Sequence, residues 1–250
     1  MIFLKTAKEL KLMRAAGRIS QRALRLAGEA VEPGVTTKEI DSLVRKYIEG
    51  QGAIPSFLGY GGFPASACIS VNNVVIHGIP TEKRVLRQGD IVSIDIGACF
   101  EGYHGDNAWT FACGDISEEA RRLLDTTEEA LFKGINAAVP GARIGDIGYA
   151  VQKCVELRSY SVVRDFVGHG VGAKLHEDPS VPNYGVPGVG TLLRPGMAIA
   201  IEPMVNMGSY KVRVLKDKWT TVTVDGKLSA HFEHTLAITP DGPVILTLPD

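Results

Sequence analysis

Residues 86–95, Leu-Arg-Gln-Gly-Asp-Ile-Val-Ser-Ile-Asp, align without a gap with residues 193–202, Leu-Arg-Pro-Gly-Met-Ala-Ile-Ala-Ile-Glu. Each copy is an apolar strand that follows a Gly-containing turn and ends on a carboxylate, Asp95 in the first copy and Glu202 in the second. Acids at equivalent places in two halves of a chain predict one site that is built from both sides. Such an acidic cluster is typical of a site for divalent metal ions.

The similarity between the halves continues along the chain at a constant offset of 107 residues. The matching pairs are Pro33-Gly34 with Pro140-Gly141, Ile40 with Ile147, Val44 with Val151, Ile48 with Val155, and Gly61 with Gly168. Two short apolar strands can match by coincidence, but agreement across helices, turns and strands favours a repeated architecture.

The composition predicts one globular domain over residues 1–250, because 45% of the chain is hydrophobic, 22% is charged and the net charge is −1. This balance gives no basic stripe for a nucleic-acid or membrane-surface partner. We see no signal peptide at the start and no apolar run long enough to span a bilayer. The four scattered cysteines form no C-x-x-C pair, so we expect a reduced, cytoplasmic protein.

Four helices are predicted, with starts near Thr6, Thr36, Ser117 and Gly141. The first two starts have a Glu three residues later, which completes a capping box. Each pair of helices precedes alternating apolar strands such as 91–96 and 197–202. The sequence therefore predicts an α+β fold, with a pseudo-two-fold internal repeat and helices packed on one face of a largely antiparallel sheet.

Strand alternation places Asp95 and Glu202 on equivalent faces, beside small residues that leave room for ions and substrate. A hairpin after Asp95 can return Asp106 to the same place, and Glu233 is the counterpart of Asp106 in the second half. Four converging carboxylates would repel one another, and two divalent ions would offset their charge. His169, between glycines in Gly-His-Gly-Val-Gly, offers a nitrogen ligand; a phosphate-binding loop is the alternative, but the spacing fits no nucleotide motif.

These five residues and their motifs resemble the metal ligands of methionine aminopeptidases, in the same order along essentially the whole chain. The motifs are Asp-Ile-Gly at Asp95, His-Gly-Asp at Asp106, Gly-His-Gly-Val-Gly at His169, Ile-Glu-Pro-Met at Glu202 and Phe-Glu-His-Thr at Glu233. That family has the pita-bread fold. The short interval between Glu202 and Glu233 resembles the type I, bacterial-style enzymes.

The resemblance implies two divalent ions, with Asp95 on one, His169 and Glu202 on the other, and Asp106 and Glu233 bridging both. Cobalt, manganese, iron and zinc all suit such ligands. A monovalent cation site is also implied, its candidate residues being Asn72, Val74 and Ser229.

Further residues match the substrate site of the family. His77 corresponds to a histidine that contacts the scissile amide, and His176 to one that stabilises charge on the carbonyl oxygen. The predicted methionine pocket consists of Tyr60, Phe63, Cys68 and Trp219. Phe57 and Leu175 depart from residues found in relatives, which leaves the shape of this pocket open. The remaining histidines, which we expect to support the ligands, are His104, His231 and His234.

The implied activity is hydrolysis of the N-terminal methionyl bond of nascent proteins and peptides that have a small second residue. A metal-activated water would attack the carbonyl, and Glu202 would act as general base and then acid. We expect a monomer that works near the ribosome exit, without nucleic-acid specificity. Two alternatives stay open: a proline-specific peptidase of the same fold, and a binding protein without catalysis.

Overall fold

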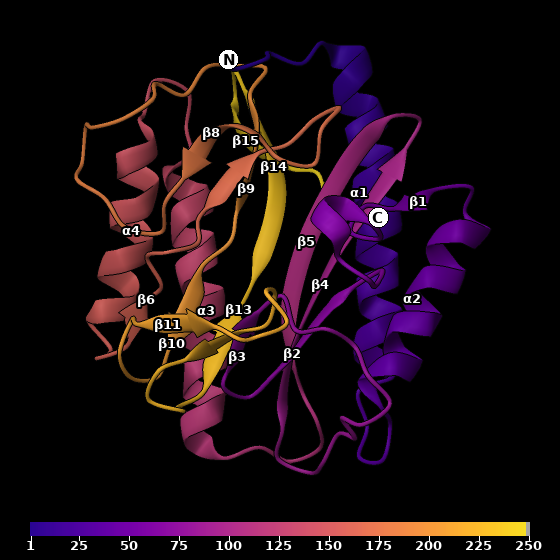
Figure 1. The fold of residues 1–250 in the computed structure, drawn as a ribbon. Helices are drawn as coiled ribbons and strands as arrows, with labels where there is room; N and C mark the ends of the chain where they lie inside the picture. Colours follow the sequence, from indigo (N-terminus) through magenta and orange to yellow (C-terminus); the bar gives the residue numbers. More distant parts are fainter. Residues whose placement is uncertain (249–250) are drawn as a thin grey trace.

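A nine-stranded sheet forms the centre of the molecule (Figure 1). The computed structural model describes residues 1–248. The strands run in the order β1-β4-β5-β14-β9-β7-β8, with β2 beside β4 and β15 beside β14. Their bounds are β1 Ile54–Pro55, β2 Cys68–Val71, β4 Ile91–Phe100, β5 Tyr103–Ala112, β7 Gly168–Gly170, β8 Glu177–Val181, β9 Ala198–Ile201, β14 Glu233–Thr239 and β15 Gly242–Ile245. All neighbouring strands pair antiparallel, as predicted.

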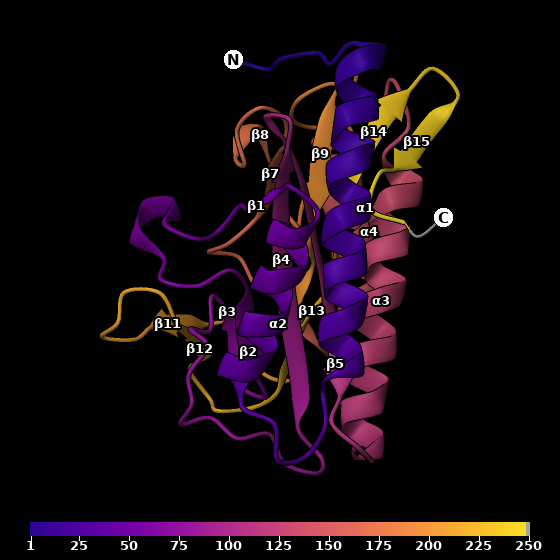
Figure 2. The same ribbon diagram turned by 90° about the vertical axis from the view of Figure 1, so that its right-hand side faces the viewer.

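In the described part of the chain, four helices cover one face of this sheet and leave the other to loops and small strands (Figure 2). They are α1 (Ala7–Glu29), α2 (Thr37–Gly50), α3 (Glu118–Ala137) and α4 (Ile144–Glu156). Within residues 1–248, no helix is long and apolar enough to cross a membrane.

The opposite face carries a 3-10 turn and two small sheets with strand orders β13-β10-β6 and β11-β12-β3. The bounds of these elements are η1 Tyr60–Gly62, β3 Val74–Ile76, β6 Ser161–Val162, β10 Met204–Asn206, β11 Val212–Val214, β12 Thr221–Thr223 and β13 Ser229–His231. In Figure 2 the β11–β12 hairpin stands out from the body on this side.

The helix starts confirm the capping patterns of the sequence. Thr6 caps α1 by accepting a hydrogen bond from the Glu9 N–H, while the Glu9 carboxylate accepts one from the Thr6 N–H. Thr36 and Glu39 form the same reciprocal pair at α2. These bonds satisfy N–H groups that a helix leaves free in its first turn.

The internal repeat is present in the backbone pairing. An isolated antiparallel bridge joins Thr36 to Val85 in the first half, and another joins Arg143 to Leu192 at the same offset of 107 residues. Each bridge ties the start of the second helix of a half to the turn before its acidic strand. The two halves therefore share their architecture as well as their sequence pattern.

Alternation along the strands separates the cores from the acids. Ile94 of β4 is fully buried in a cluster with residues of α1 and α2, and Ile201 of β9 is fully buried in a cluster with residues of α3 and α4. Because neighbouring residues of a strand point to opposite faces, Asp95 and Glu202 point away from the helices. Burial of the apolar side chains thus fixes which face the acids occupy.

We predict that Gly105→Ala destabilises the fold by about 1–3 kcal/mol, because it overpacks the contact between β5 and α1. A Cβ on Gly105 would lie 2.4 Å from the backbone nitrogen of Gly17, so α1 or the strand that contains Asp106 must move. Urea unfolding measures the change. Gly50→Ala, at the end of α2 with no atom within 4 Å of its added Cβ, is the control and should lose no stability. Equal stability of the two variants would contradict the predicted overpacking.

Candidate active site

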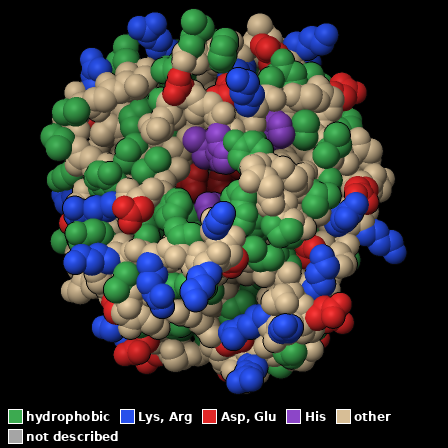
Figure 3. Space-filling view, in the orientation of Figure 1, with side chains coloured by type: hydrophobic (Ala, Val, Ile, Leu, Met, Phe, Trp, Pro, Cys, Tyr) green, Lys and Arg blue, Asp and Glu red, His purple; other side chains and the backbone are tan. Residues whose placement is uncertain are grey.

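A cavity of about 600 Å³ opens on the face opposite the helices (Figure 3). Figure 3 shows acidic side chains at its base and histidines at its rim. The structure brings the predicted metal-ligand, catalytic and methionine-pocket residues to this cavity: Tyr60, Phe63, Cys68, His77, Asp95, Asp106, His169, His176, Glu202, Trp219 and Glu233.

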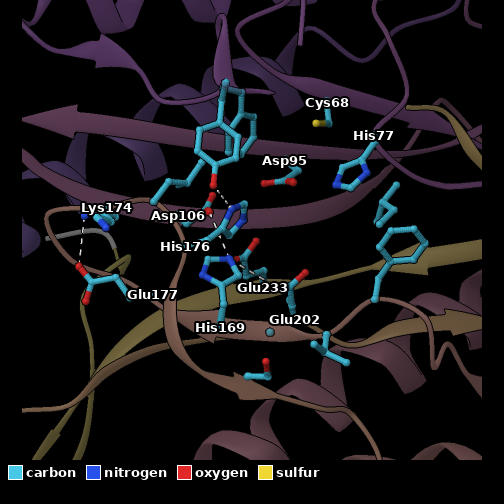
Figure 4. A pocket seen from close by; sticks show the side chains of 18 of the residues that line it. Cys68, His77, Asp95, Asp106, His169, Lys174, His176, Glu177, Glu202 and Glu233 are labelled. Atoms are coloured by element: carbon cyan, nitrogen blue, oxygen red, sulfur yellow. Dashed lines mark hydrogen bonds and ion pairs between the residues drawn. The ribbon is translucent and has the colours of Figure 1, made fainter. Parts of the chain in front are cut away.

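Five adjacent strands each place one of the predicted metal ligands there (Figure 4). Asp95 lies on β4, Asp106 on β5 and Glu233 on β14; Glu202 directly follows β9, and His169 lies on β7. The order of these strands in the sheet is β4-β5-β14-β9-β7. The donors therefore form a row across the sheet, although 138 residues separate the first from the last in sequence.

The geometry of His169 suits a metal ligand. Its Nδ1 lies 2.9 Å from the Gly170 carbonyl oxygen, to which the ring donates, so Nε2 keeps its lone pair. Nε2 lies 3.5 Å from Glu202 Oε1 and 3.9 Å from Asp106 Oδ2. One ligand atom each from Asp106, His169 and Glu233 lies within 4.8 Å of the others, as donors to a common ion require.

Three buried oxygens in this row have no hydrogen-bond partner among residues 1–248, namely Asp95 Oδ1, Asp106 Oδ1 and Glu233 Oε1. Buried polar atoms are normally paired, and the remaining partner for a carboxylate cluster is a cation. Carboxylates with one imidazole suit divalent transition metals. The residues therefore fit the metal site that the sequence predicts.

Burial and mutual repulsion disfavour negative charge in this cluster when no cation is present. Burial raises the pKa of Asp106 from 3.8 to about 7. Burial, together with the neighbouring carboxylates, raises the pKa values of Asp95, Glu202 and Glu233 well above their ordinary range. Burial also lowers the pKa of His169 to about 3, which keeps the imidazole neutral and able to bind metal.

Two histidines face the cavity beside the acids. His176 Nδ1 forms a 2.7 Å hydrogen bond with the Tyr60 hydroxyl, and its ring lies edge-on to that of His169. His77 has a backbone φ of 56°, which is uncommon for a residue with a side chain and indicates a position held by its surroundings. Its ring packs against Phe166 and Trp219. Burial lowers the pKa of His77 to about 4.

An apolar wall lies next to these polar groups. Its buried residues are Phe57, Phe63, Ala65, Cys68 and Leu175, with Ile79 and Trp219 packed against them. Phe57 and Leu175, the two departures from the family pattern, are both part of this wall. Both side chains are apolar and buried, at positions where the sequence left the shape of the pocket open.

Sequence reasoning missed two features of the cavity. Phe166 packs on His77, and no motif pointed to it. Lys5 forms an ion pair with Glu177 in which the two side chains are only 5% and 6% exposed, so the segment before α1 holds the strand after His176. Glu177 could have been suspected from its place beside His176, whereas Lys5 gives no signal of its own.

The remaining predicted residues lie outside the row of acids. His104 Nδ1 bonds to Ser56 Oγ at 2.8 Å. His234 lies on the helix side of the sheet, bonded to Thr247 and packed against Trp109, so it does not support the ligands as expected. Ser229 and Asn72 are adjacent, since the Ser229 N–H donates to the Asn72 carbonyl, but a monovalent cation there stays a prediction.

Comparison with known proteins identifies the family to which this chain belongs. The model of metallopeptidase family M24 matches residues 11–240. The chain belongs to metallopeptidase family M24. A methionine aminopeptidase of Clostridium perfringens is 58% identical over 99% of both chains. The crystal structure of a methionine aminopeptidase from Thermotoga maritima superposes with a TM-score of 0.97 and 46% identity over 99% of both chains.

This M24 member matches methionine aminopeptidases of bacteria, which confirms the resemblance to the type I enzymes and the pita-bread fold. Prolidase from Pyrococcus horikoshii shares the fold more distantly, with a TM-score of 0.79 and 25% identity. The match covers 99% of this chain but 64% of the prolidase. The chain is therefore closer to the aminopeptidases in sequence, in fold and in length.

We predict that metal stabilises this protein more strongly at pH 8 than at pH 6. Asp106 titrates near 3.8 when unfolded and near pH 7 when folded without metal, so its protonation stabilises the folded state and stability falls as the pH rises between these values. His169 and His231 have folded pKa values of about 3 instead of 6.5, so their contribution rises with pH and is complete above 6.5. Above that pH these two histidines no longer contribute to the slope, whereas Asp106 still does up to about pH 7.

Thermal unfolding of metal-stripped and reconstituted protein across this pH range measures the effect. Calorimetry in two buffers should also detect protons released on metal binding, because the acids must ionise to act as ligands. A stabilisation by metal that is independent of pH would contradict this account of the cluster.

Proposed function

We propose that this protein removes the N-terminal methionine from proteins and peptides whose second residue is small. The observation that carries the proposal is the combination of five metal-ligand donors from five adjacent strands with an apolar wall in the same cavity. The activity named for relatives that are 58% and 55% identical supports it.

In this proposal Asp95 would hold one ion, His169 and Glu202 would hold the other, and Asp106 and Glu233 would serve both. Bound ions would lower the pKa of a water molecule and polarise the scissile carbonyl, the established chemistry of metals in peptide hydrolysis. Two divalent ions match the four buried carboxylates in charge, which supports their number.

Glu202 is the proposed proton carrier. Its Oε1 faces His169 within the cavity, where it can take a proton from water and pass it to the leaving amine. His77 and His176 line the cavity and would donate hydrogen bonds to the peptide, His77 to the scissile amide and His176 to the carbonyl oxygen. The bond from Tyr60 occupies His176 Nδ1, so Nε2 is the atom free for the substrate.

The apolar wall suits the methionine side chain. An unbranched thioether gains favourable contacts beside aromatic rings, and the rings of Phe63 and Trp219 lie 5.2 Å apart in an edge-to-face arrangement. Tyr60 and Cys68 line the same cavity. The position of Phe57 and Leu175 in the wall supports a closely fitting pocket for the first residue.

We further propose that residues 1–250 act as one catalytic domain and as a monomer in the cytoplasm, where the four free cysteines would stay reduced. The substrate would be met near the ribosome exit. The β11–β12 hairpin and its flanks expose the basic residues Lys211, Arg213, Lys216, Lys218 and Lys227 beside the cavity that Trp219 lines. Such a surface favours approach to a negatively charged particle.

Reversing the charge of this hairpin should separate docking to the ribosome from hydrolysis of the peptide itself. Lys216→Glu with Lys218→Glu is expected to slow methionine removal from ribosome-bound chains, while hydrolysis of a free tripeptide keeps its rate. Equal rates on ribosome-bound chains for this double variant and the parent protein would refute the docking proposal.

A substrate panel tests the activity itself. Metal-reconstituted protein should release methionine from Met-Ala-Ser much faster than it cleaves an Xaa-Pro peptide, and the metal-stripped protein should be inactive. Release of proline-containing products alone would support the proline-specific alternative. No turnover with manganese, iron, cobalt or zinc would support a binding protein.

We predict that Glu202→Gln lowers kcat by at least about 100-fold, the usual contribution of a positioned acid or base. Metal content measured on the same sample separates lost proton transfer from lost metal. Glu156→Gln, an exposed acid on α4, is the matched control and should retain its activity. A fully active Glu202 variant would rule out the assigned role.

A further inference from the structure

His231 is a buried histidine directly behind Glu202. Its side chain is 2% exposed and does not line the cavity. Its Nε2 is a buried polar atom without a hydrogen-bond partner. Glu202 Oε2 lies 3.7 Å from that nitrogen.

The two oxygens of Glu202 therefore face different histidines. Oε1 lies 3.5 Å from His169 Nε2 on the cavity side, and Oε2 faces His231 on the buried side. The gap to His231 exceeds the usual N–H···O range by about half an ångström, which a small rotation of the carboxylate closes. An N–H at His231 Nε2 would then give this buried nitrogen the partner that it lacks.

Two hydrogen bonds to Thr110 hold the backbone of His231 in place. Its N–H donates to Thr110 Oγ1 at 3.0 Å, and the Thr110 hydroxyl donates to the His231 carbonyl at 2.8 Å. Thr110 lies on β5, the strand that also contains Asp106. The imidazole is thus held against the same sheet as the row of acids.

We propose that His231 is a positioning residue that donates a hydrogen bond from Nε2 to Glu202 Oε2 and so directs Oε1 toward His169 and the ion site. The inference rests on the proposed role of Glu202. It assigns one oxygen of that carboxylate to orientation and leaves the other for metal binding and proton transfer, in the way that buried partners orient metal ligands.

His231→Gln and His231→Met form the test pair, because the two side chains have similar length and only glutamine can donate. We expect His231→Met to bind one added divalent ion about 10–100-fold more weakly than the parent protein, with a similar loss in kcat. Its KM for Met-Ala-Ser should change little. His231→Gln should have nearly the same metal affinity and kcat as the parent protein. His234→Gln, a buried histidine on the helix side, controls for general disturbance and should leave metal affinity unchanged.

Metal affinity measured by calorimetry separates this inference from the proposed function. Unchanged affinity in His231→Met, or equal losses in the two variants, would overturn the role of His231 even if Glu202→Gln is inactive. An active Glu202→Gln would instead refute the proposed function of that residue.

Nitrogen NMR on histidine-labelled parent protein gives a test that needs no stable methionine variant. The signal missing from His231→Gln identifies His231. Protonated Nε2 supports the proposal, and an unprotonated Nε2 overturns it, since that atom would then be an acceptor or a direct ligand.

Discussion

The central constraint on this structure is the burial of four carboxylates on one face of a sheet. Taking such groups out of water costs several kcal/mol each unless charge and hydrogen bonds compensate. Asp95, Asp106 and Glu233 instead keep buried oxygens without partners, and the pKa values of all four acids are raised. Protonation or bound cations can compensate this cluster, and it lies in a cavity where cations and substrate can enter.

The internal repeat explains how such a cluster arises, and the differences between the copies explain its chemistry. Equivalent strands supply Asp95 and Glu202, and equivalent bridges fix the turns before them. The second half adds His169, where the first half has Gly62. The two ends of the row thus differ: an acid alone at β4, and an acid with a neutral imidazole at β9 and β7.

Much of this could be predicted from the sequence, because the signals are local or repeated. The capping residues, the hairpin that returns Asp106 and the side of the sheet that Ile94 and Ile201 occupy all follow from short-range patterns. The order of strands across the halves does not, since no local pattern states that β14 lies between β5 and β9.

The contacts that sequence reasoning missed join distant positions. Lys5 and Glu177 are 172 residues apart and meet only through the path of the whole chain. The place of His231 behind Glu202 depends on the register of β13 against β10 and on side-chain direction. Nearby His234 was expected to have the same supporting role, but its side chain lies on the helix side of the sheet, beside Thr247 and Trp109.

The candidate metal site lies at the junction between the two halves of the chain. Strands β5 and β14 pair there through only two positions, Glu233 with Ala108 and His234 with Asn107, beside a bond from Thr235 to the backbone of Asp106. Asp106 and Glu233, one from each half, face each other at this short junction. In the proposed metal arrangement, an ion shared by Asp106 and Glu233 would link the two halves of the sheet across this junction.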